Sequence, residues 1–264
     1  MDLGLKGKRA LVTGSTAGIG LAAARALAAE GAHVTVNGRT EARVAEAVRQ
    51  IQAAVPGAAV DGVAADVGTA AGCAEVARRV PAVDVLVNNL GIFEVLPFAE
   101  IPDAEWMRFF ESNVLSGVRL SRAYVEGMRK GGWGRIVFVS SASALQIPTE
   151  MIHYGATKAA QLALARGLAE TLAGTGVTVN SVLPGPTATE GLTGFVAGQA
   201  EQRGVDAATV ERDFFQNARP SSIVQRFLTT DEIASLITYL CGEPASGTTG
   251  AALRVDGGVV RAIA

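Results

Sequence analysis

Two side chains in the middle of the chain could together move a proton to or from an oxygen atom. Tyr154 and Lys158 are four residues apart in an alanine-rich stretch of helical period, so a helix sets both on one face. A tyrosine with a pKa of about 10 needs roughly 4 kcal/mol of differential stabilisation to be half-ionised near pH 7. An ammonium group about 5 Å away contributes about 3 kcal/mol at an effective dielectric constant of about 20. Lys158 could therefore supply most of the shift that makes Tyr154 an acid and base for a carbonyl or alcohol oxygen.

Ser141 stands thirteen residues before this tyrosine, at the end of a predicted strand. A serine hydroxyl there would hydrogen-bond a substrate oxygen and orient it against Tyr154. Taken alone, a tyrosine four residues before a lysine on a helix is usually an exposed pair without a catalytic role. The functional interpretation therefore depends on whether other features of the chain agree with it.

A turn suited to binding phosphate lies near the N-terminus. A predicted strand over residues 9–13 runs into Thr13-Gly14-Ser15-Thr16-Ala17-Gly18-Ile19-Gly20, and a helix begins within that segment. Glycine lets the backbone approach a pyrophosphate, while the helix N-terminus offers unpaired N–H groups to the anion. Glycine-rich turns are also common as plain corners. The strand-turn-helix order here favours a dinucleotide-binding turn.

The elements that must position these residues alternate regularly along the chain. Short β-branched runs predict strands, and stretches of helical period predict helices between them. Runs such as 83–87 and 135–139 are almost continuously apolar, as expected for strands covered on both faces. We expect a Rossmann-type, doubly wound α/β fold with about seven parallel strands and ligands outside their carboxyl ends. The expected strands are 9–13, 33–37, 59–64, 83–88, 135–140, 178–183 and 252–256, and the expected helices are 18–30, 40–54, 70–79, 103–129, 153–174 and 231–241.

One region breaks this alternation. Residues 185–226 form a long insertion with several glycines, anchored by Phe195, Phe214 and Phe215. A stretch like this is more often a functional lid than a connector, so we expect residues 1–264 to form a single domain with a substrate lid at about 185–226. The phenylalanines hint at an apolar substrate, although they can equally form the lid's own small core.

Composition excludes several classes of function. Of the 264 residues 49% are hydrophobic and the formal net charge is −2, without a Lys/Arg cluster, which argues against a nucleic-acid partner. We find no secretion signal and no apolar run of about 20 residues, so we expect a cytoplasmic protein without a membrane partner. Cys73 and Cys241 have no metal-like spacing and are expected to be buried or idle thiols, and no metal site is predicted.

Several motifs resemble those of the short-chain dehydrogenase/reductase family. The glycine turn has its T-G-x-x-x-G-x-G spacing, and Asn88-Asn89-Leu90-Gly91 resembles its N-N-A-G element with Leu90 in place of alanine. Residues 154–158 match its Y-x-x-x-K motif, and Pro184-Gly185 followed by Thr189 resembles its P-G-x-x-x-T element. The motifs occur in the family's order over essentially the whole chain.

The resemblance implies a reversible hydride transfer between a nicotinamide and a carbonyl or secondary alcohol, with Tyr154 exchanging the proton. Lys158 would also hold the nicotinamide ribose, and Asn113 would hold a water that links Lys158 to solvent. The family spacing favours Ser141 over Ser140, whose side chain should point the other way in a strand. A homotetramer or dimer, built partly through the helices around 103–129 and 153–174, is also implied. The implied cofactor contacts besides Lys158 are Gly14, Ser15, Thr16, Gly18, Ile19, Gly20, Asp66, Val67, Asn88, Gly91, Pro184, Gly185, Thr187 and Thr189.

The residues after the second expected strand bear on the choice of nicotinamide. An acid about twenty residues beyond the glycine turn would bind the adenosine ribose and mark NAD, but the sequence there reads Asn37-Gly38-Arg39-Thr40. Arg39 could pair with a 2′-phosphate, with Asn37 and Thr40 as further hydrogen-bonding groups. It could also be only a solvated or adenine-stacking residue. We therefore favour NADP(H), with NAD(H) possible.

Alternatives remain for some residues and for the substrate. Asp66 could cap a helix rather than contact adenine. His153 adjoins Tyr154 and could touch the substrate or cap its helix. A small-molecule carbonyl or alcohol is the expected substrate, and reduction of a 3-oxoacyl thioester is an alternative. A second alternative function is that of a regulator that binds a dinucleotide without catalysis, although such a protein would not need Ser141, Tyr154 and Lys158 together.

Overall fold

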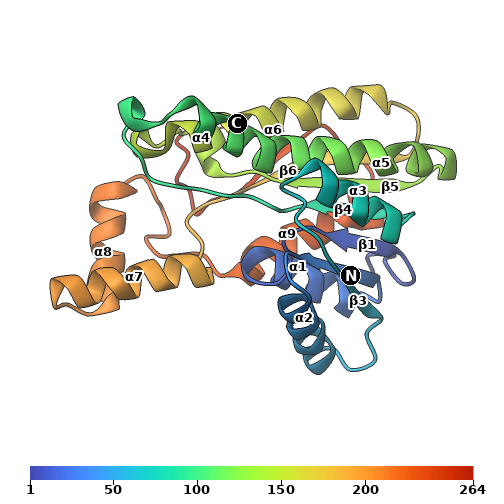
Figure 1. Ribbon diagram of the computed structural model, residues 1–264, viewed down its shortest axis with the longest axis horizontal. Coiled ribbons are helices and arrows are strands. Elements are labelled where there is room, and N and C mark those ends of the chain that lie inside the picture. The colour runs from blue at the N-terminus through green and yellow to red at the C-terminus, as the bar shows by residue number, and fades with distance from the viewer. Residues whose placement is uncertain (264) are drawn as a thin grey trace.

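A seven-stranded parallel sheet with the order β3-β2-β1-β4-β5-β6-β7 runs through the centre of the computed structural model, which describes residues 1–263 (Figure 1). Every expected strand is present, with each boundary within two residues of its predicted place, and the parallel Rossmann-type fold is confirmed. The direction in which successive strands are added to the sheet reverses after β3. As a result β1 lies between β2 on one side and β4 on the other. The strands are β1 (Arg9–Val12), β2 (His33–Gly38), β3 (Val60–Ala64), β4 (Val85–Asn88), β5 (Gly134–Val139), β6 (Val177–Pro184) and β7 (Ala252–Val255).

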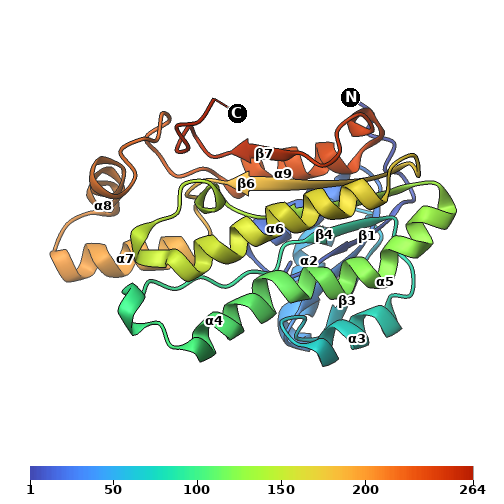
Figure 2. The same ribbon diagram turned by 90° about the horizontal axis from the view of Figure 1, so that it is seen from above.

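Helices cover both faces of the sheet. Helices α1 (Gly18–Ala29), α2 (Glu41–Ala54) and α9 (Thr230–Cys241) pack on one face, and α3 (Ala70–Arg79), α5 (Ser116–Gly131) and α6 (Ile152–Thr171) pack on the other. Figure 1 shows the resulting three layers, and Figure 2 looks onto the layer formed by α3, α5 and α6. Alternate residues of β5 enter the two cores, since Val137 contacts the α1 side and Ile136 the α5 side. This two-sided burial explains the nearly continuous apolar runs.

The expected helix over residues 103–129 is interrupted. It consists of α4 (Asp103–Phe110), a π-helical turn η2 (Glu111–Leu115) and α5. Asn113 lies in that turn, and its side-chain amide hydrogen-bonds to both the N–H and the carbonyl of Ile92. Such turns are frequent at functional sites, and here the turn ties the helix to the loop after β4.

Residues 185–226 contain structure that the sequence analysis did not predict. They form α7 (Glu190–Arg203), α8 (Ala207–Asp213) and the π-helical turn η5 (Phe214–Ala218), which project to one side of the sheet (Figure 1). Val196, Ala200 and Val210 form a small core of this unit's own. A bridge between Thr187 and Leu228 closes its base.

No helix within residues 1–263 combines the length and apolar character needed to cross a membrane.

Candidate active site

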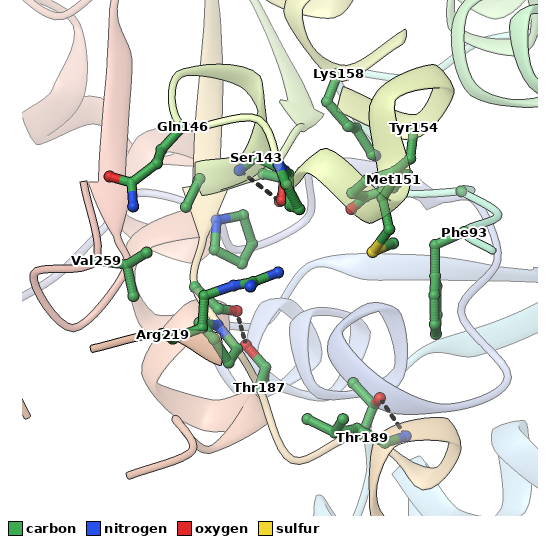
Figure 3. A pocket seen from close by; sticks show the side chains of 18 of the residues that line it. Phe93, Ser143, Gln146, Met151, Tyr154, Lys158, Thr187, Thr189, Arg219 and Val259 are labelled. Atoms are coloured by element: carbon green, nitrogen blue, oxygen red, sulfur yellow. Dashed lines mark hydrogen bonds between the residues drawn. The ribbon is translucent and has the colours of Figure 1, made fainter. Parts of the chain in front are cut away.

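A cavity of about 740 Å³ lies at the carboxyl ends of the central strands. Its walls come from the first turn of α1, the loops after β4 and β5, the start of α6 and the segment after β6. This is the edge of a parallel sheet at which ligands bind in doubly wound folds. The predicted site residues that line the cavity are Ile19, Gly91, Ser141, Tyr154, Lys158, Pro184, Gly185, Thr187 and Thr189, several of which Figure 3 shows.

The two adjacent serines after β5 point in different directions. The Ser140 hydroxyl is buried and donates to the carbonyl oxygen of Lys158 at 2.8 Å. The Ser141 hydroxyl lines the cavity and accepts from the N–H of Ser143 at 3.1 Å. The Ser140 hydroxyl is therefore occupied inside the protein, whereas the Ser141 hydroxyl is open to a substrate. Strand alternation predicted only that the two side chains would point in different directions.

Tyr154 lies on the first turn of α6 with its ring half-buried at the cavity wall. Burial raises the pKa of Tyr154, and hydrogen bonding with Ser141 opposes that rise. The spacing of Tyr154 and Lys158 predicted that Lys158 would lower the pKa of this tyrosine. In this structure the desolvation of the phenol dominates instead, so the prediction is wrong for the chain by itself.

Lys158 has an unusual environment for an amine. Only 3% of its surface is exposed, and burial lowers the pKa of Lys158 from 10.5 to about 7. Its Nζ lies 5.6 Å from the centroid of the Tyr154 ring and donates to the carbonyl oxygen of Val139 at 2.9 Å. A lysine that is only about half charged near pH 7 supplies less of the electrostatic help that the sequence analysis assigned to it.

Gln161 connects this lysine to Asn113. Its side-chain oxygen accepts from Lys158 Nζ at 3.3 Å, and its Nε2 donates to the backbone carbonyl of Asn113 at 2.5 Å. Both N–H donors of the Asn113 side chain are used, one by the carbonyl of Ile92 and the other by Thr157 Oγ1. A buried amide thus joins the two residues for which the resemblance implied a water. Sequence reasoning missed Gln161, although it follows Lys158 by three residues on one helix face.

The glycine turn has the shape that a pyrophosphate requires. Gly14 and Gly18 have φ values of +59° and +56°, which residues with a side chain rarely adopt. A Cβ on Gly20 would lie 2.5 Å from Asn89 Nδ2, so the turn admits no side chain there. The N-cap of α1 is Ala17, which offers no side-chain oxygen to the first N–H groups of the helix. The residues present therefore fit a dinucleotide phosphate.

Ser15 lies within this turn but is occupied by internal contacts. Its hydroxyl donates to the carbonyl of Val12 and accepts from the N–H of Asn37, while its own N–H donates to the carbonyl of Asn37. Ser15 therefore shapes the turn. Thr16 lies beside Gly38 at the end of β2.

Of the residues at the end of β2 that were predicted to bind a 2′-phosphate, Asn37 is buried, whereas Arg39 and Thr40 are exposed. Asn37 is buried, where its side chain accepts from the N–H of Gly14 and donates to the carbonyls of Val63 and Ala65. Its expected contact with a 2′-phosphate is therefore wrong. Thr40 caps α2 with its hydroxyl. Arg39 is exposed, which leaves its guanidinium accessible to an anion.

Three further predicted contacts, Asp66, Val67 and Asn88, do not line the cavity. Asn88 is buried and donates to Ser121 on α5, whereas Asn89 lines the cavity and holds the glycine turn through the carbonyls of Thr13 and Gly14. The Val67 side chain is buried in the core. Asp66 accepts from the N–H of Gly68, and the cap of α3 is Thr69 instead.

His153 plays neither of the roles considered for it. Its ring is fully buried against Phe109, at 4.0 Å between ring centroids, and the N-cap of α6 is Met151. Burial lowers the pKa of His153. The prediction of a substrate contact or helix cap is wrong because this face of α6 packs onto α4.

The cavity wall also contains aromatic side chains that were not among the predicted site residues. Phe93 follows the N-N-x-G element, and its ring meets Tyr154 edge-on at 6.4 Å between centroids. Phe195 of α7 is 58% exposed and faces the cavity, whereas Phe215 is buried inside the projecting unit. The remaining unpredicted lining residues include Gln146, Glu150, Met151, Leu192 and Arg219.

Within residues 1–263, no group of three or more His, Cys, Asp and Glu side chains could hold a metal ion. Cys73 and Cys241 are buried free thiols, and burial raises the pKa of Cys241 to about 12.

The fold and the cavity define a class of protein. A parallel sheet with a glycine turn after its first strand, and a serine, tyrosine and lysine on one cavity wall, is the architecture of a nicotinamide-dependent oxidoreductase.

Comparisons with known proteins identify the family. Residues 8–200 match the family model described as short chain dehydrogenase. Over the full length of both chains, the sequence is 46% identical to the uncharacterized oxidoreductase YvaG of Bacillus subtilis. It is 35% identical to D-beta-hydroxybutyrate dehydrogenase of Cupriavidus necator, over 97% of this chain and 99% of the relative. The crystal structure of L-sorbose reductase from Gluconobacter frateurii, complexed with NADPH and L-sorbose, superposes with a TM-score of 0.95 at 33% identity over 100% of both chains. The chain therefore belongs to the short-chain dehydrogenase/reductase family and is an oxidoreductase acting on alcohol or carbonyl groups.

Proposed function

We propose that the protein reversibly reduces a small carbonyl compound with NADPH, using Tyr154 as the acid and base. The observation that carries this proposal is the meeting of Ser141, Tyr154 and Lys158 on one wall of the cavity that also contains Ile19 of the glycine turn. Two of the three proteins named above act, by their names, on a hydroxy acid and on a ketose, so we propose a substrate of similar size. Direct reduction of a bulky acyl thioester gains no specific support from the cavity.

The chain's own residues would handle the proton. Tyr154, whose raised pKa keeps the phenol protonated, donates to the substrate oxygen, and the Ser141 hydroxyl donates a second hydrogen bond that fixes that oxygen. Charged Lys158 stabilises the tyrosinate that remains, and Gln161 positions Lys158 against Asn113. The nicotinamide, when bound, supplies the hydride.

The cofactor would lie along the carboxyl edge of the sheet. We propose that the turn binds its pyrophosphate and that Arg39 pairs with a 2′-phosphate, which makes NADPH the preferred form. Arg43 lies one turn into α2, with Nη2 4.0 Å from a Glu190 carboxylate oxygen, and adds positive charge at this end. The proposed contacts are Gly14, Thr16, Gly18, Ile19, Gly20, Arg39, Asp66, Gly91, Lys158, Pro184, Gly185, Thr187 and Thr189, with Ser15, Val67 and Asn88 supporting them from within the protein.

Residues 185–226 would act as the lid over the substrate, since Leu192 and Phe195 of α7 and Phe214 of η5 reach the cavity from this unit. We also propose that residues 1–264 act as one domain and assemble as a dimer or tetramer through α4, α5 and α6, which light scattering of the purified protein would measure.

The proposal is tested by fluorescence titration with NADPH and NADH, followed by a screen of small ketones. We expect tighter binding of NADPH, and a roughly 10-fold to 100-fold loss of that preference in Arg39→Ala, because a charge-assisted hydrogen bond contributes about 1.5–3 kcal/mol. Arg49→Ala, on the exposed face of α2, is the matched control. Equal binding of both cofactors would refute the assignment of NADPH, and the absence of binding would refute the proposed activity.

A further inference from the structure

Arg219 places a positive charge in the substrate part of the cavity. Among the described residues that line the cavity, the charged side chains are Glu150, Lys158 and Arg219. Lys158 is committed to Tyr154 and the cofactor ribose in the proposed function. The Arg219 side chain is only 18% exposed and extends into the cavity, on the opposite side from Met151 and Tyr154 in Figure 3. A guanidinium in this position is available to a substrate.

The hydrogen bonds of Arg219 leave one edge of its guanidinium group open. Nη1 and Nη2 both approach the same oxygen of Glu150, at 3.4 Å and 3.3 Å, and Nη1 also donates to the carbonyl of Ala218 at 2.7 Å. Arginine has five N–H donors, and these contacts use three of them. Within residues 1–263, the Nε–H and the second Nη2–H have no acceptor. These two donors are parallel and form the fork that binds a carboxylate in a bidentate manner.

The surroundings of Arg219 hold this fork in place. Its backbone N–H donates to the carbonyl of Phe214, and its guanidinium lies 5.6 Å from the centroid of the Phe214 ring. Glu150 occupies the other edge of the group and is 43% exposed. Because Glu150 is negative, the site favours a singly charged carboxylate over a doubly charged phosphate.

We propose that Arg219 binds the carboxylate of the substrate through its Nε–Nη2 edge, so that the protein acts on oxo acids and the corresponding hydroxy acids. This inference rests on the proposed function, because it concerns the substrate of the same cavity. The carboxylate end of the substrate lies on the lid, and the carbonyl end lies at Ser141 and Tyr154. Binding at Arg219 therefore sets which carbonyl reaches the reacting position.

The test compares acids with their neutral amides. The wild-type protein, with NADPH, is given 3-oxobutanoate, 4-oxopentanoate and 5-oxohexanoate, each beside its primary amide, and neutral L-sorbose. We expect kcat/KM for the best acid to exceed that for its amide by roughly 30-fold or more, as expected for a bidentate charge-assisted pair. In Arg219→Met this ratio should fall by a similar factor. Arg219→Lys should restore part of it, because it keeps the charge without the fork.

Arg212→Met is the matched control, since Arg212 also belongs to the lid but bonds to Thr209 and does not line the cavity. Its ratio should equal that of the wild type. If the contact between Arg219 and Glu150 only holds the lid in place, Arg219→Met should lower the rates for the acid and for its amide equally. An unchanged ratio in Arg219→Met, or a wild-type ratio near one, would overturn the inference while reduction of neutral ketones still supports the proposed function. If no carbonyl compound is reduced, the proposed function fails and the inference with it.

Discussion

The buried ammonium group of Lys158 donates a hydrogen bond to the carbonyl oxygen of Val139, at 2.9 Å, at the carboxyl end of β5. The last residue of that strand thereby holds the amine beside Tyr154, and the burial that this position requires lowers the pKa of Lys158 to about 7. The amine therefore changes charge near neutral pH.

The free energy of unfolding should depend on the titration of Lys158. The unfolded chain binds a proton at Lys158 up to about pH 10.5, whereas the folded chain releases it above about pH 7. Between these values the unfolded state holds more protons, so the free energy of unfolding gains a contribution that rises with pH. Relative to Lys158→Met, the wild type should gain roughly 1.5 kcal/mol between pH 7 and pH 8.5. Urea unfolding at both pH values measures it. A difference that stays flat or falls would contradict the assigned pKa.

Catalysis should depend on the same proton. We expect kcat/KM for reduction to fall as the pH rises through about 7, because neutral Lys158 no longer stabilises the tyrosinate. Gln161→Glu places a carboxylate beside the ammonium and should move this fall to higher pH, whereas Gln161→Met removes an acceptor and should not. A pH–rate profile of the three proteins decides this. Identical profiles would show that Gln161 does not act on Lys158.

The glycine turn should tolerate no added methyl group. A Cβ in Gly20→Ala would lie 2.6 Å from the carbonyl oxygen of Gly14, so the turn must shift. We expect NADPH binding to weaken on the order of 10-fold to 100-fold, from the 1–3 kcal/mol that overpacking costs. Gly127→Ala is the control, because a Cβ there meets nothing within 4 Å in the interior of α5 and should stabilise the fold by about 1 kcal/mol. Equal NADPH affinity in both variants would remove the turn from the cofactor site.

The strands could be predicted because their burial on both faces leaves a mark in the chain itself, as in 135–139. Strand alternation likewise predicted that Ser140 and Ser141, directly after β5, point in different directions, and the family spacing favoured Ser141. The choice between Asn88 and Asn89 could not be made that way, because it depends on how the loop after β4 meets the glycine turn. The π-helical turn at Asn113 also depends on a partner, Ile92, that is distant in sequence.

The helices of the lid could not be predicted from the sequence for a similar reason. Its helices α7 and α8 bury few residues against the sheet, so their apolar periodicity is weak, and their small core is formed within the unit itself. The roles of Arg219 and Gln161 depend on Glu150 and Asn113, which are far from them in sequence. Such contacts become visible only in the folded chain.

The most direct test of the proposed mechanism compares wild type with Tyr154→Phe, using NADPH oxidation with a reducible ketone and, in parallel, NADPH binding. Removing the phenol should lower kcat by roughly 10³-fold, because it removes the proton donor. The affinity for NADPH should change less than about threefold, since the glycine turn and Arg39 are untouched. A variant that binds NADPH and keeps wild-type turnover would contradict the assignment of Tyr154 as the acid and base.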